Sequence, residues 1–150
     1  MDLTNIKAGE EIEVGPFVGC RFWRYRLTPL TLWSWMLNAR EWLPGEPCEA
    51  DKPPEMEGYH GIYGYKTMDG LHDYIGWKEP EKGVGPRPRW VHPYHGDADG
   101  IIMGTVALWG TTVIHPLGYR AHYGQPLSFT EAFGTRADEA LARLRTRFGV

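Results

Sequence analysis

The sequence predicts a single α+β domain, in which a strongly bent, mostly antiparallel sheet or partial barrel carries one short helix and a C-terminal covering helix. Strand-forming residues fill 104–123 and are interrupted at 116–118, which predicts a β-hairpin. An apolar stripe of helical period runs through 135–148. Nineteen Gly and twelve Pro imply many turns and argue against a helical bundle. A chain of 150 residues can bury a core without a metal or a disulfide.

The first part of the chain predicts strands. Residues 1–16 are polar and predict a peripheral arm with one short strand at Glu11–Val14. Residues 17–26 are rich in aromatic side chains whose alternation is imperfect, which predicts a strand with apolar contacts on both faces. Residues 28–43 admit two interpretations. Thr28-Pro29 could begin a helix, but three tryptophans within ten residues favour a strand.

The middle of the chain alternates loops with short elements. Residues 44–57 hold four prolines and five acids and predict an exposed loop. A glycine-interrupted strand is expected at 58–67, and Thr67 is expected to cap a short helix at 68–77. Residues 79–100 show no apolar periodicity and predict a long loop, a feature that is usually functional or mobile.

The central hairpin is expected to act as a scaffold. In its second strand, 119–123, alternation places Arg120 and His122 on the face opposite the aromatic residues. Trp109 is expected to anchor the packing, and Gly110 is expected to form a β-bulge.

The C-terminal helix is expected to cover one face of the sheet. Its start, at Thr135 to Asp138, is similar to a capping box, and Gly149 is expected to end it. The apolar stripe consists of Ala137, Ala140, Leu141, Leu144 and Phe148.

Charge and composition limit the class of protein. A net charge of −3 gives no bulk attraction to nucleic acid or anionic membranes. No stretch approaches eighteen uncharged apolar residues, and the polar N-terminal segment lacks the apolar core of a signal peptide. Cys20 and Cys48 fit no zinc or redox spacing. We therefore expect a cytoplasmic protein with reduced thiols and no membrane association.

Several short segments together carry a resemblance to a known group: 42–47 (WLPGEP), 61–67 (GIYGYKT), 104–115 (GTVALWGTTVIH) and 118–121 (GYRA). The combination resembles small uncharacterised proteins of actinobacteria and their phages, which share a G-I-Y turn, a V-x-L-W-G strand, a downstream His and a G-Y/W-R-A strand. The resemblance implies a shared fold and no particular activity. Relatives often have Cys before the turn and Glu after the His, where this chain has His60 and Pro116.

A candidate ligand-binding surface lies around the hairpin turn. His115 and Arg120 flank the turn, so their side chains could meet across it and, with His122, bind an anion or transfer protons. The alternative is a purely structural pair, which the usual behaviour of polar residues on sheets favours. The full candidate set is Tyr59, His60, Tyr63, Trp109, His115, Arg120 and His122.

Two further sets of residues carry weaker hypotheses. Imidazole and carboxylate groups in the 79–100 loop could hold zinc, although their spacing matches no known site and a solvated polar loop is the simpler interpretation. Otherwise no cofactor is expected. These candidates are His92, His95, Asp97 and Asp99.

Arginines interleaved with aromatic residues could bind nucleic acid, which the negative net charge disfavours. These candidates are Arg21, Trp23, Arg24 and Arg26.

The sequence favours non-catalytic binding of another protein. Seven Trp, eight Tyr and five Phe are more than the core of one small domain readily absorbs, and exposed Trp and Tyr beside Arg are typical of interface hot spots. The phage-like resemblance adds the hypothesis of an accessory protein that acts on a host factor. One alternative is a small-molecule or metal-dependent enzyme using His60, His115, Arg120 or the 92–95 histidines. A second alternative is a nucleic-acid binder using residues 21–26.

Overall fold

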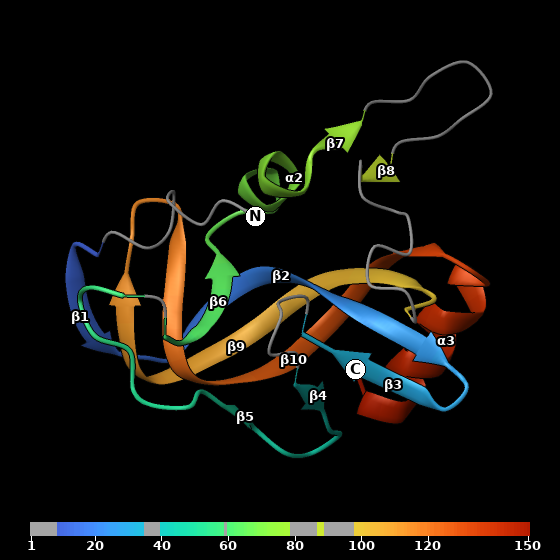
Figure 1. Ribbon diagram of the computed structural model, residues 1–150, viewed down its shortest axis with the longest axis horizontal. Helices are drawn as coiled ribbons and strands as arrows, with labels where there is room; N and C mark the ends of the chain where they lie inside the picture. The colour runs from blue at the N-terminus through green and yellow to red at the C-terminus, as the bar shows by residue number, and fades with distance from the viewer. Residues whose placement is uncertain (1–8, 35–39, 59, 79–86, 89–97) are drawn as a thin grey trace.

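A computed structural model describes residues 9–34, 40–58, 60–78, 87–88 and 98–150 (Figure 1). In these residues, eight antiparallel strands form one bent sheet, and the helices α2 (Met68–Ile75) and α3 (Ala137–Phe148) pack on it. The predicted α+β class, with a partial ring of strands and a C-terminal helix, is confirmed. The sheet strands are β1 (Glu11–Val14), β2 (Phe17–Leu27), β3 (Leu30–Trp33), β4 (Glu41–Trp42), β5 (Cys48–Glu49), β6 (Ile62–Tyr65), β9 (Gly100–Ile114) and β10 (Gly118–Gly134). A separate two-stranded ribbon joins β7 (Trp77–Lys78) to β8 (Arg87–Pro88).

The partial ring is built on one long hairpin. Strands β9 and β10 pair along nearly their whole length, and Figure 1 shows them as the two long curved ribbons in yellow and orange. Strand β2 pairs with β9, and β6 pairs with β10. A single pairing, Cys20 with Tyr65, joins β2 to β6 and links the ends of this four-strand set.

Two apolar cores lie on opposite faces of β2 and β9. Successive side chains of a strand point to opposite faces, so Trp23 and Ile102 enter the larger core while Phe22 and Met103 enter the smaller one. Helix α3 covers the larger core and α2 covers the smaller one. The expected apolar contacts on both faces of β2 are therefore confirmed. The buried helix residues are Leu71, Ile75, Ala140 and Leu144.

Most of the predicted elements are present. The strands expected at Glu11–Val14 and within 17–26 form, and the strand interpretation of 28–43 holds for β3 and β4. Thr67 caps α2, because its hydroxyl accepts a hydrogen bond from the Gly70 backbone N–H at 3.0 Å. Gly110 has φ +74° and lies at a shift in the β9–β10 register, as expected for a bulge.

Some predictions were wrong. The prediction of an exposed loop holds for most of 44–57 but is wrong at β5, which pairs with β10, because Cys48 and the neighbouring Ala50 are buried in the larger core. The capping box of α3 does not form. Arg136 is the N-cap, in the left-handed region at φ 50°, and no side chain caps the helix. Thr135 is instead held by its backbone, which donates to Asp99 O and accepts from the Tyr25 hydroxyl.

Two segments differ from their expected lengths or roles. Strand β10 was expected only over 119–123, but it continues to Gly134 through two further register shifts that hide its alternation. The short strand of the expected peripheral arm pairs with β9 and so belongs to the main sheet. Most of the predicted loop at 79–100 lies outside the described residues.

Candidate functional site

His115 and Arg120 meet across the hairpin turn, as the sequence predicted, but both are fully buried. The Arg120 Nε donates a hydrogen bond to His115 Nε2 at 3.0 Å. A nitrogen that accepts a hydrogen bond carries no proton, so this imidazole is in its neutral form. The other guanidinium nitrogens donate to the backbone carbonyls of His60 at 2.8 Å, Glu55 at 2.8 Å and Met56 at 3.3 Å.

The arrangement makes Arg120 a clamp that holds segment 55–60 against β10. Burial lowers the pKa of Arg120, and nearby Tyr63 offsets part of that effect. Because neither Arg120 nor His115 is accessible to solvent, their geometry is that of a structural pair and not of an anion site. His60 contributes its carbonyl to the clamp while the residue itself is exposed.

Of the remaining candidate ligand residues, Tyr63 is the cross-strand partner of Arg120, whereas His122 makes other contacts. A register shift between Ala121 and Tyr123 interrupts the expected alternation of β10. His122 lies against Tyr123, with ring centroids 4.2 Å apart, and its Nε2 is 3.4 Å from Glu49 Oε2. The Tyr63 carbonyl accepts a hydrogen bond from Arg21 Nη1 at 2.8 Å. Tyr59 lies outside the described residues.

Arg21 and Arg24 of β2 donate hydrogen bonds within the protein. Arg21 donates to Tyr63 O and to Ser34 Oγ, and its guanidinium lies 4.9 Å from the centre of the Trp42 ring. Burial lowers the pKa of Arg21 to about 10, against smaller opposing effects of Cys48 and Tyr74.

The neighbouring residues of β2 fit the same structural role. Arg24 Nε donates to the Ser34 carbonyl at 3.1 Å, and Trp23 is fully buried. A nucleobase therefore has no access to the Trp23 ring, so Trp23 cannot supply the base stacking that the nucleic-acid hypothesis requires.

The predicted metal ligands are only partly described. His92, His95 and Asp97 lie outside the described residues. Asp99 accepts a hydrogen bond from the Leu27 backbone N–H at 2.7 Å and so joins the start of β9 to the end of β2. Among the described residues, no group of three or more His, Cys, Asp and Glu side chains is placed to hold a metal ion.

The two thiols are not activated as nucleophiles. Burial raises the pKa of Cys48, although Arg21 and Arg40 lower it in part, and burial also raises the pKa of Cys20. A raised pKa leaves less thiolate at neutral pH and therefore less reactivity. Burial, with a contribution from Asp99, raises the pKa of Tyr25 to about 12.

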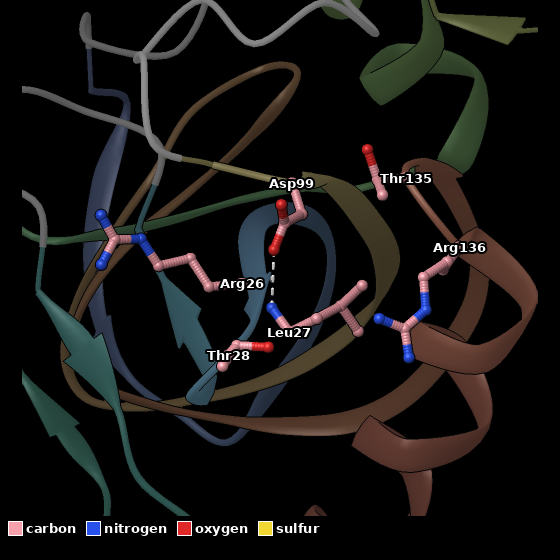
Figure 2. Close-up of a pocket in the computed structure, with 6 residues that line it drawn as sticks. All are labelled: Arg26, Leu27, Thr28, Asp99, Thr135 and Arg136. Carbon is pink, nitrogen blue, oxygen red and sulfur yellow. Dashed lines mark hydrogen bonds between the residues drawn. The ribbon is translucent and has the colours of Figure 1, made fainter.

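A pocket of about 400 Å³ lies where the β2–β3 turn, the start of β9 and the start of α3 converge (Figure 2). One oxygen of Asp99 is already bound to Leu27 N–H. In Figure 2 the Arg136 side chain leans toward Leu27, whereas the Arg26 guanidinium points away from the others. The pocket is polar and contains no nucleophile beside a base. Its lining residues are Arg26, Leu27, Thr28, Asp99, Thr135 and Arg136.

An exposed apolar surface lies on the face of the sheet opposite the larger core. Val18 pairs with Ala107, and the neighbouring pair of Phe17 with Leu108 points into that core. Val14 pairs with Thr111, next to the pair of Glu13 with Thr112, a fully buried residue whose partner on β10, Ala121, belongs to that core. Because side chains alternate along a strand, Ile12, Val14 and Val18 all point outward. Their exposed fractions are 48%, 77% and 58%.

Two aromatic residues extend this surface over β9 and β10. Trp109 and Tyr123 are direct cross-strand partners and stack at 5.8 Å with an interplanar angle of 18°. Both are half-buried, so Trp109 lies at the surface and packs there on Tyr123. We call Ile12, Val14, Val18, Trp109 and Tyr123 the outer patch. The only sign of this patch in the sequence is that its three aliphatic residues, all at even-numbered positions, share one face of an alternating strand pattern.

No protein-family model matches the chain, and no curated protein or solved structure is detectably similar to it. The resemblance to small actinobacterial and phage proteins therefore stays a prediction. Within the described residues, no helix is both long and apolar enough to cross a membrane.

Proposed function

We propose that this protein is a non-catalytic binding protein that holds another protein against the outer patch. The observation that carries the proposal is the row of three outward aliphatic side chains, which are 48% to 77% exposed. Scattered exposed apolar residues are ordinary, but a contiguous apolar surface is typical of an interaction site. The Trp109–Tyr123 stack beside it supplies the large aromatic side chains that dominate binding energy in interfaces.

The proposal differs in one respect from the aromatic and arginine surface that the sequence suggested. Arg21 and Arg120 hydrogen-bond to groups within the protein, so they are not offered to a partner. The proposed surface therefore combines aliphatic and aromatic side chains without arginine. An accessory role of phage type, with a host factor as partner in the cytoplasm, is proposed on the sequence resemblance alone.

The test is capture of an actinobacterial host protein on the immobilised full chain, followed by a measured affinity for that protein. The double substitution Val14→Lys and Val18→Lys introduces two charges into the patch. We expect it to weaken binding at least 30-fold, the equivalent of about 2 kcal/mol for hot-spot residues.

Leu117→Lys is the matched control, because Leu117 is an aliphatic residue 46% exposed at the hairpin turn and outside the patch. This variant is expected to bind like the unchanged protein. Unaltered binding by the double variant would contradict the proposal, as would a tight small-molecule ligand in place of any protein partner.

A further inference from the structure

Strand β1 has an open edge. It is the first strand in the sheet order and pairs with β9. The Gly15 N–H donates to Gly110 O at 3.3 Å, which continues the β1–β9 ladder. Backbone groups alternate between the two sides of a strand. Glu11 and Glu13 therefore bond to β9, and Ile12 and Val14 turn their N–H and C=O groups to the open side. No other described strand pairs with them.

The open edge is strongly acidic. Glu10, Glu11 and Glu13 are all exposed, and none of them takes part in a salt bridge within the described part of the chain. On the opposite side of the strand, Ile12 and Val14 belong to the outer patch. The edge thus offers backbone hydrogen-bonding groups, carboxylates at alternate positions and apolar side chains between them.

We propose that β1 receives an extended segment of the partner protein as an added strand, with Lys or Arg at alternate positions opposite Glu11 and Glu13. This inference rests on the proposed function, because the added strand would continue onto the outer patch. Backbone pairing at a sheet edge is a common way to bind peptides, and alternate side chains set its specificity. Residues directly opposite one another in an antiparallel pair lie about 5 Å apart, close enough for carboxylates to select basic residues.

A second copy of this chain fits the edge less well than a basic segment does. In a pair formed by β1 and its own copy, side chains that lie opposite each other point to the same face of the sheet. The glutamates of one copy would therefore lie opposite the glutamates of the other. Like charges directly opposite each other destabilise a strand pair. Charge therefore favours a partner that is a different, basic chain.

The test uses the full chain with two labelled, capped peptides, one of alternating Lys and Val and one of alternating Glu and Val. We expect fluorescence anisotropy to show at least tenfold tighter binding of the Lys peptide, and this preference should weaken as salt is raised. Ile12→Pro removes an outward N–H that β9 does not use, so it should abolish binding. Ile12→Thr keeps that N–H and loses only the apolar side chain, so it should weaken binding much less than Ile12→Pro does.

A charge reversal gives an independent test should Ile12→Pro fold poorly by circular dichroism. Glu11→Lys with Glu13→Lys should make the protein prefer the Glu peptide. Equal binding of both peptides, or equal binding by Ile12→Pro and Ile12→Thr, would overturn the inference. So would a dimer, detected by sedimentation, that Ile12→Pro dissociates. The two proposals can fail separately. If the Val14 and Val18 double variant no longer binds the captured protein, but the unchanged protein binds both peptides equally, the proposed function is supported and the strand-addition inference is refuted.

Discussion

At the scale of single residues, Arg120 shows how one buried cation organises a loop. Its hydrogen bonds reach His115 and three backbone carbonyls of segment 55–60, which is distant in sequence. Removing such a group leaves several buried acceptors without a donor, and each of these carries a desolvation cost.

Arg120→Ala is expected to lower the free energy of unfolding by about 3 kcal/mol, as for other broken buried networks. Urea titration followed by circular dichroism measures the change. Arg143→Ala is the matched control, because Arg143 makes an exposed ion pair with Glu139 at 3.3 Å whose loss should cost under about 1 kcal/mol. If both variants lose equally little stability, Arg120 is not a clamp.

The meeting of His115 and Arg120 could be predicted from the sequence, because the short turn at 116–118 brings them together. Their burial could not. The segment that covers Arg120 comes from residues 55–60, and nothing in its acidic, proline-rich sequence indicates a cover for β10. The outer patch could not be predicted for a related reason. The alternation of residues along a strand shows which side chains share a face, but not which of the two faces is buried.

At the scale of elements, α3 begins in an unusual way. Arg136 occupies the left-handed region, at φ 50° and ψ 46°, and no side chain caps the first turn. An L residue other than glycine in this region costs roughly 1–2 kcal/mol. The amphipathic period of the helix could be read from the sequence. Its starting conformation could not, because it is imposed by the pairing of Thr135 N–H with Asp99 O at 2.9 Å.

Arg136→Gly is therefore expected to raise the free energy of unfolding by up to about 1 kcal/mol, because glycine adopts the left-handed region without strain. Thermal unfolding of the two proteins measures the difference. Arg136→Ala also removes the ion pair with Glu139 but keeps the Cβ atom, so no gain is expected. An equal gain in both variants would assign the effect to the ion pair and not to the backbone.

At the scale of the whole molecule, the bent sheet depends on close approach between β9 and β10. Gly104 pairs with Arg21 on one side and with Phe129 on the other. A Cβ atom at this position would lie 1.8 Å from the Ser128 carbonyl oxygen. The sequence predicted the α+β class and the bend. It could not predict the single pairing of Cys20 with Tyr65 that links β2 to β6, because one residue pair leaves no periodic signal.

Gly104→Ala is expected to destabilise the protein by more than about 3 kcal/mol, because the backbone of two strands must separate to admit a methyl group. In a domain of this size the melting temperature should fall by roughly 6–12 °C. Gly45→Ala tests the effect of a methyl group alone, since a Cβ at Gly45 meets nothing within 4 Å and the cost is confined to its φ of +73°. Similar losses in both variants would refute the role given to Gly104.

The long hairpin also implies an order of events during folding. Strands β9 and β10 meet at a turn of a few residues, so their pairing can grow outward from Pro116 and Leu117 with little loss of chain entropy at each step. Pairing of β2 with β9 instead joins residues that are 75 to 91 positions apart in the sequence. Such distant contacts form slowly. We therefore expect the hairpin to assemble early as a template, and docking of β2 onto it to limit the folding rate.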